Sequence, residues 1–88
     1  MDNPRTLHLR EGFLDSLRQF IPDPWEADQV LFGARWILMR DPHRGRQRPG
    51  SHVWTYLTRP PGRDTPFLIY YTFDDEHVVF LRITPQPL

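Results

Sequence analysis

Ten prolines divide this chain of 88 residues into short stretches, and they set where helices and strands can begin and end. The residue before a proline is pushed out of the helical region, so Ile21-Pro22 closes one segment. Pro42 in the same way prevents a preceding helix from continuing. A chain of this length sits near the lower end of what one hydrophobic core can support. We therefore expect a single domain, residues 1–88, built from short elements.

The composition excludes several classes of protein and of chemistry. Apolar residues make up 39% of the chain and aromatic residues 14%, which is too much for a disordered tail. The chain has no cysteine, which excludes disulfides and cysteine-ligated zinc, and its eleven basic residues are all arginines, which excludes lysine Schiff bases. The histidines and carboxylates show no metal-ligand spacing, so we expect neither a metal nor a cofactor. Without a long apolar run or a signal-peptide pattern, we expect a soluble, cytoplasmic protein.

Two segments show the spacing and the boundary signals of helices. Apolar side chains recur at helical spacing over residues 11–20. Asp23-Pro24-Trp25-Glu26 then offers an acidic N-cap, proline at the first helical position and glutamate three residues after the cap. The helix that begins there is expected to reach about Arg40 and to lie deep against the core. Its apolar stripe comprises Ala27, Val30, Leu31, Ala34, Ile37 and Leu38, broadened by Phe32, Trp36 and Met39.

Strand patterns occupy most of the remaining sequence. Alternating or β-branched and aromatic residues predict strands over 6–9, 51–58, 66–73 and 76–84, with a tight acidic turn at 74–76. Residues 41–51 contain two prolines and two glycines and are expected to form a loop, as are residues 59–64. The predicted order is β-α-α-β-β-β. Such a chain most simply forms an α+β fold, with a small antiparallel sheet and both helices packed on one face.

Charge is balanced over the whole chain but concentrated in its middle. Residues 40–63 carry six arginines against one acidic residue, a net charge of +5. Clustered guanidinium groups bind phosphate oxygens, so one interpretation is a nucleic-acid surface; the other is that charged loops keep a small protein soluble. The candidate nucleic-acid-binding residues are Arg44, Arg46, Arg48, Arg59 and Arg63.

The element order, the segment 36–45 (Trp-Ile-Leu-Met-Arg-Asp-Pro-His-Arg-Gly) and the final hairpin resemble the RelE/ParE superfamily of bacterial toxins. The resemblance covers roughly residues 6–84. Its most specific piece is residues 67–83, where an aromatic-rich strand and an acidic turn are followed by Val-Val-Phe-Leu-Arg-Ile. These are segments that determine the fold, so the resemblance is stronger for architecture than for chemistry.

What the resemblance implies is the toxin of a type II toxin-antitoxin pair, neutralised by a cognate antitoxin. One branch cleaves messenger RNA on the ribosome without a metal, using basic residues to hold the scissile phosphate, and the ParE branch poisons DNA gyrase. The alternatives are a non-catalytic protein-interaction module of the same fold and a stand-alone RNA-binding protein. Positions where ribonuclease members carry lysines, an arginine and a final tyrosine are not matched here, since Trp54, Tyr56 and Phe67 occupy the strands and the sequence ends at Leu88.

Three residues are candidates for catalysis by such a ribonuclease. His52 is suited to proton transfer because a histidine side chain titrates near neutral pH, and Tyr56 shares its predicted strand face. Arg82 lies on the last strand, where it faces the open side of the sheet or pairs with a carboxylate. Each also has a structural interpretation: a solvated histidine, a core aromatic ring and a surface ion pair.

Overall fold

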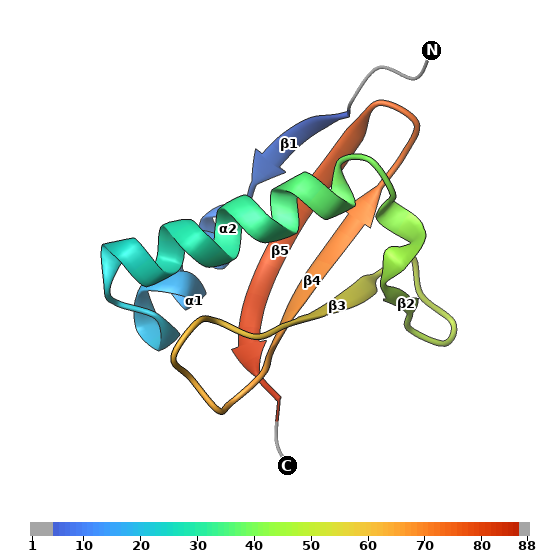
Figure 1. Ribbon diagram of the computed structural model, residues 1–88. Coiled ribbons are helices and arrows are strands. Elements are labelled where there is room, and N and C mark those ends of the chain that lie inside the picture. The colour runs from blue at the N-terminus through green and yellow to red at the C-terminus, as the bar shows by residue number, and fades with distance from the viewer. Residues whose placement is uncertain (1–4, 87–88) are drawn as a thin grey trace.

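The computed structural model describes residues 5–86, which form two helices and a five-stranded sheet (Figure 1). The sheet has the strand order β1-β5-β4-β3-β2. Within the described residues, neither helix is long and apolar enough to cross a membrane. The elements are β1 (Thr6–Leu9), α1 (Glu11–Phe20), α2 (Pro24–Leu38), the short 3-10 helix η1 (Pro42–Arg44), β2 (Arg46–Gln47), β3 (Trp54–Thr58), β4 (Phe67–Phe73) and β5 (His77–Pro85).

The α+β class is confirmed, and the sheet is mixed. Strands β2 to β5 pair antiparallel, as expected for hairpin connections, whereas β1 pairs parallel with β5, Leu7 lying opposite Val78 and Leu9 opposite Phe80. The parallel pairing arises because both helices lie between β1 and the rest of the sheet in the sequence. Figure 1 shows α2 crossing one face of the sheet.

Helix α1 covers the part of the β5 edge that β1 leaves open. The register of β1 ends at Phe80, and beyond it the backbone N–H of Ile83 donates to Ser16 Oγ of α1 at 2.9 Å. Ser16 Oγ in turn donates to the carbonyl of Phe13 at 2.9 Å. Helix α1 therefore hydrogen-bonds a strand edge that would otherwise be open to another chain.

Helix α2 begins as the sequence predicts, with the Asp23 carboxylate accepting a hydrogen bond from the backbone N–H of Glu26 at 3.2 Å. Its last helical residue is Leu38, and Met39 forms the cap and is buried. The expectation that Trp36 lies in the core is wrong, because 57% of that residue is exposed; Phe32 is 68% exposed. One side of α2 packs on the sheet and another carries aromatic rings into solvent.

The core lies between the helices and one face of the sheet. Because side chains alternate along a strand, the buried residues of β4 and β5 point to the helices, and the intervening ones point away. The fully packed set is Phe13, Leu17, Ile21, Val30, Ala34, Leu38, Met39, Phe67, Ile69, Tyr71, Val78, Phe80 and Ile83. We call the other side of the sheet the open face, since no described helix packs on it.

The predicted loop at 41–51 contains two short elements that the sequence did not indicate, η1 and β2. Strand β2 pairs with the start of β3, placing Arg46 opposite Thr55 and Gln47 opposite Trp54. It adds a fifth strand and brings part of the basic segment onto the sheet.

Candidate nucleic-acid interface on the open face of the sheet

A row of polar, aromatic and basic side chains crosses four strands of the open face. Arg46 of β2 lies opposite Thr55 of β3, Thr55 opposite Tyr70 of β4, and Tyr70 opposite Arg82 of β5. Directly opposed residues of neighbouring strands present their side chains on the same face. Adjacent strands are about 4.8 Å apart, so the row spans roughly 14 Å across the sheet.

Tyr70 forms the centre of this row, with a guanidinium group near its ring from two directions. The Arg82 guanidinium carbon lies 5.0 Å from the ring centroid, and that of Arg48, from the segment after β2, lies 5.6 Å away. Both distances are within the range of cation-π attraction. Arg46, Arg48 and Arg82 are all exposed, whereas Tyr70 is half-buried. We call Arg46, Arg48, Thr55, Tyr70 and Arg82 the open-face row.

A β-bulge in β5 places Arg82 on this face. The register pairs Tyr70 with Arg82 but Tyr71 with Phe80, which leaves Leu81 without an opposed residue. Strict alternation would put Arg82 on the same side as the buried Phe80. The extra residue of the bulge turns Arg82 outward and returns Ile83 to the core.

The position of β2, and with it of Arg46 and Arg48, depends on the buried side chain of Tyr71. Its hydroxyl donates to the carbonyl of Pro42 at 2.5 Å and accepts a hydrogen bond from the N–H of Gly45 at 3.2 Å. Burial, as the largest cause, raises the pKa of Tyr71 to about 12. A Cβ at Gly45 would collide with the Thr55 carbonyl and the Tyr71 hydroxyl, so glycine lets this backbone come close to the sheet.

The three catalytic candidates do not lie together. Arg82 belongs to the open-face row, whereas Tyr56 lies opposite Ile69, on the side of the sheet that faces the helices, and packs against the core. His52 is exposed in the bend before β3. Tyr56 and Arg82 thus point to opposite sides of the sheet. Trp54 is also on the helix-facing side, where His43 and Phe73 contact its ring edge to face.

The candidate nucleic-acid-binding arginines fall into two groups. Arg44, Arg46 and Arg48 are in or beside η1 and β2, at the start of β3, whereas Arg59 and Arg63 follow the end of β3. The Arg63 guanidinium pairs with the Glu26 carboxylate at 2.6 and 3.3 Å. This contact holds the pKa of Glu26 below its ordinary value, chiefly through the hydrogen bond. Arg63 therefore ties the 59–64 loop to α2.

The sequence-based reasoning missed Tyr70 and Thr55. The signal was present in β4, where Phe67, Ile69 and Tyr71 are buried and Tyr70 is out of phase with them. Among residues 5–86 no three histidine or carboxylate side chains gather in a way that would hold a metal ion. What the row offers is guanidinium groups for phosphate oxygens and a ring on which a base can stack.

Comparison with known proteins agrees with this architecture. No family model matches the chain, and no curated protein matches it either. Among solved structures, it is similar to a chain in the crystal structure of the toxin-antitoxin complex RelBE2 from Mycobacterium tuberculosis, with a TM-score of 0.69 and 26% identity. The match covers 98% of both chains, so it includes all five strands and both helices. The fold and the likeness over the whole length support the resemblance of this chain to the RelE/ParE superfamily of toxins.

Proposed function

We propose that this chain is the toxin of a type II toxin-antitoxin pair, neutralised by a cognate antitoxin, and that it contacts RNA through the open-face row. The toxin-antitoxin assignment is supported by the likeness to a chain of the RelBE2 complex over 98% of the length. The RNA assignment depends on one observation: the guanidinium carbons of Arg48 and Arg82 lie 5.6 and 5.0 Å from the Tyr70 ring centroid, on a sheet face with no described helix on it.

The chemistry of the row favours a single-stranded nucleic acid. Sequence-specific and non-specific binding of unpaired bases combines ring stacking with guanidinium contacts to the backbone. A protein surface such as that of gyrase presents neither splayed bases nor a regular series of phosphates. Messenger RNA in the ribosome is thus the target class that the row fits better than gyrase.

Cleavage of the RNA is the finer part of this proposal. Guanidinium groups stabilise the negative charge that develops on a phosphate during attack by the ribose 2′-hydroxyl. Arg82 is the catalytic candidate that belongs to the row and is proposed for that role. The Tyr70 hydroxyl, which lies on the strand next to that of Arg82, is proposed for proton transfer. The alternative, a non-catalytic interaction module, predicts no binding of RNA at the row.

A binding titration with a fluorescent single-stranded RNA tests this proposal. Tyr70→Ala is expected to weaken binding about tenfold or more, since each stacked base contributes about 1–3 kcal/mol. Arg82→Ala should weaken binding and reduce the salt dependence, as one phosphate contact on a single strand contributes a slope of about 0.7. Arg35→Ala, on an exposed arginine of α2 on the other side of the sheet, is the matched control and should bind as the wild type does. Equal binding by Tyr70→Ala, Arg82→Ala and the wild type would overturn the RNA assignment.

A further inference from the structure

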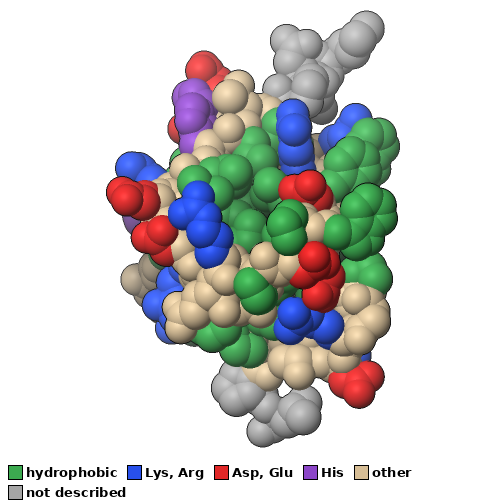
Figure 2. Space-filling model, turned by 90° about the vertical axis from the view of Figure 1, so that its left-hand side faces the viewer, with side chains coloured by type: hydrophobic (Ala, Val, Ile, Leu, Met, Phe, Trp, Pro, Cys, Tyr) green, Lys and Arg blue, Asp and Glu red, His purple; other side chains and the backbone are tan. Residues whose placement is uncertain are grey.

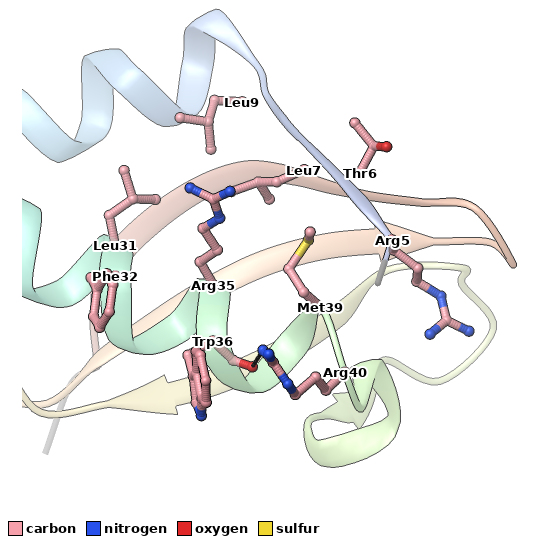
Figure 3. A pocket seen from close by; sticks show the side chains of 10 residues that line it. All are labelled: Arg5, Thr6, Leu7, Leu9, Leu31, Phe32, Arg35, Trp36, Met39 and Arg40. Atoms are coloured by element: carbon pink, nitrogen blue, oxygen red, sulfur yellow. Dashed lines mark hydrogen bonds between the residues drawn. The ribbon is translucent and has the colours of Figure 1, made fainter. Parts of the chain in front are cut away.

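The outer side of α2 carries a second group of exposed side chains, away from the open-face row. Trp25, Phe32 and Trp36 are 71%, 68% and 57% exposed. Figure 3 shows Phe32 and Trp36 projecting from the same side of α2, and Figure 2 shows hydrophobic side chains gathered along the side of the molecule where α2 lies. An apolar patch of this kind on a small folded protein marks a surface that another molecule covers.

The exposed residues of α2 follow the seven-residue repeat of a contact between two helices. With Trp25 at position d of the repeat abcdefg, Gln29 falls at a, Phe32 at d and Trp36 at a, and positions a and d are those that face a partner helix. The residues that pack on the core of the same chain fall at b, c and f. They are Ala27, Val30, Leu31, Ala34, Ile37 and Leu38. Helix α2 therefore has one side for its own sheet and another side that is patterned for a second helix.

Two opposite charges flank the a and d positions. Asp28 and Arg35 are both exposed and both fall at position g, seven residues apart. Within residues 5–86, neither side chain forms an ion pair. The acidic residue lies in the N-terminal half of α2 and the basic residue in its C-terminal half. A second copy of α2 running in the opposite direction would therefore set Asp28 of each copy beside Arg35 of the other, and it would bring together opposite ends of the two helix dipoles.

We infer that two copies of this chain associate through α2, with the helices antiparallel and a two-fold axis near their middle. Trp25 of one copy then packs against Trp36 of the other, and Gln29 against Phe32, because both pairs are centred on the same point of the helix, between residues 30 and 31. A two-fold contact requires a self-complementary patch, which this order of side chains and the flanking charges provide. The Arg40 guanidinium carbon, 3.7 Å from the Trp36 ring centroid, covers one face of that ring and leaves the other face for the second copy.

The size of this contact sets its strength. Helix α2 has 15 residues and is about 22 Å long, so each copy contributes a strip roughly 22 Å by 10 Å. Such a contact falls below the ~1,200 Å² of a stable interface, and we expect a weak dimer that dissociates in the micromolar range. Both open-face rows stay uncovered, because α2 lies on the other side of the sheet. The inference therefore does not depend on the proposed function.

Sedimentation equilibrium of the purified intact chain, over a range of micromolar concentrations, tests the association. The wild type is expected to change from monomer to dimer as the concentration rises. Trp36→Ala and Phe32→Ser should each raise the dissociation constant about tenfold or more, since aromatic anchors dominate binding at protein interfaces. Leu57→Ser, which removes an apolar side chain of the open face that is 44% exposed, is the matched control and should dimerise as the wild type does.

Charge reversals at the flanking positions test the antiparallel orientation. Asp28→Arg and Arg35→Asp should each weaken the dimer about fivefold or more at low salt, because each sets like charges beside one another at two places in the dimer. A mixture of the two variants should associate again, since the arginines of one then lie beside the aspartates of the other. The double variant Asp28→Arg, Arg35→Asp keeps the net charge and should dimerise as the wild type does.

The possible results bear on the dimer and on its orientation separately. A wild-type chain that stays monomeric over this range would overturn the inference, and so would a dimer that Trp36→Ala and Phe32→Ser leave unchanged. Single charge reversals without effect, or a double variant that does not recover, would overturn the antiparallel arrangement. Circular dichroism of each variant shows whether a lost dimer reflects a lost fold.

Discussion

At the scale of single residues, Tyr71 connects the core to the candidate interface. Its ring belongs to the core, and its hydroxyl holds the backbone at Pro42 and Gly45. Without that hydroxyl, the buried carbonyl of Pro42 and the half-buried N–H of Gly45 would lose a hydrogen-bond partner. Tyr71 is thus a structural support for Arg46 and Arg48, which come shortly after Gly45 in the sequence.

Alkaline pH should lower the folding stability of the protein, because Tyr71 loses its proton there. Its pKa is raised to about 12 in the folded chain, against about 10 for an unperturbed tyrosine. The folded state therefore holds this proton more tightly than the unfolded state does. The resulting contribution to folding stability is fully present below pH ~10 and is lost as pH rises from about 10 to 12, by up to about 1.4 kcal/mol per pH unit. Chemical denaturation at a series of pH values measures this slope.

Tyr71→Phe is the variant that isolates the effect. It should destabilise the chain by about 1–3 kcal/mol at neutral pH, because the Pro42 carbonyl and the Gly45 N–H lose their partner. It should also flatten the loss of stability above pH ~10. A Tyr71→Phe variant as stable as the wild type at neutral pH, with the same alkaline slope, would contradict the role given to this hydroxyl.

Trp36→Ala, in contrast to Tyr71→Phe, should have little effect on folding stability. With 57% of the residue exposed, the free energy of unfolding should fall by about 1 kcal/mol or less, including the loss of the Arg40 contact. Thermal or denaturant unfolding measures it. A loss of about 3 kcal/mol or more is typical of a buried tryptophan and would show that the ring is part of the core.

At the scale of elements, the sequence predicted the helices and strands that are long enough to show a periodic pattern of apolar residues. The helix at 11–20 and the cap at Asp23 were predicted, as were the strands now seen as β1, β3, β4 and β5. Strand β2 has two residues, too few for any alternation, and exists because Gly45 and Tyr71 hold it against β3. The parallel pairing of β1 is a long-range contact that local periodicity does not encode.

The same limits apply to the candidate site. The sequence pattern places Arg82 on the last strand. The face of the sheet that it occupies, however, depends on a bulge at Leu81, which no residue pattern predicts. Trp36 fits the apolar period of α2 yet projects into solvent, because the sheet offers only one side for the helix to cover. Apolar character predicts burial in this fold only where an element has a partner.

Gly45→Ala tests how β2 is held. Its Cβ would meet the backbone of Thr55, which has no flexible group to move aside, so we expect a loss of about 1–3 kcal/mol in stability. RNA binding should weaken as well, since β2 carries Arg46 and precedes Arg48. Gly33→Ala is the matched control, because a Cβ at that exposed position of α2 meets nothing within 4 Å. It should stabilise the helix by about 0.5–1 kcal/mol and leave RNA binding unchanged.

At the scale of the whole molecule, the two sides of the sheet expose different kinds of side chain. The open face carries the arginines and Tyr70 that would contact RNA, and α2 on the other side carries exposed aromatic rings.

Growth of bacterial cells after induction of the intact chain tests the central claim most directly. We predict that induction arrests growth, that co-expression of the adjacent open reading frame relieves the arrest, and that the double variant Tyr70→Ala, Arg82→Ala no longer arrests growth although it accumulates as folded protein. Normal growth at high levels of the folded wild-type chain would contradict the assignment as a toxin and favour a non-catalytic interaction module.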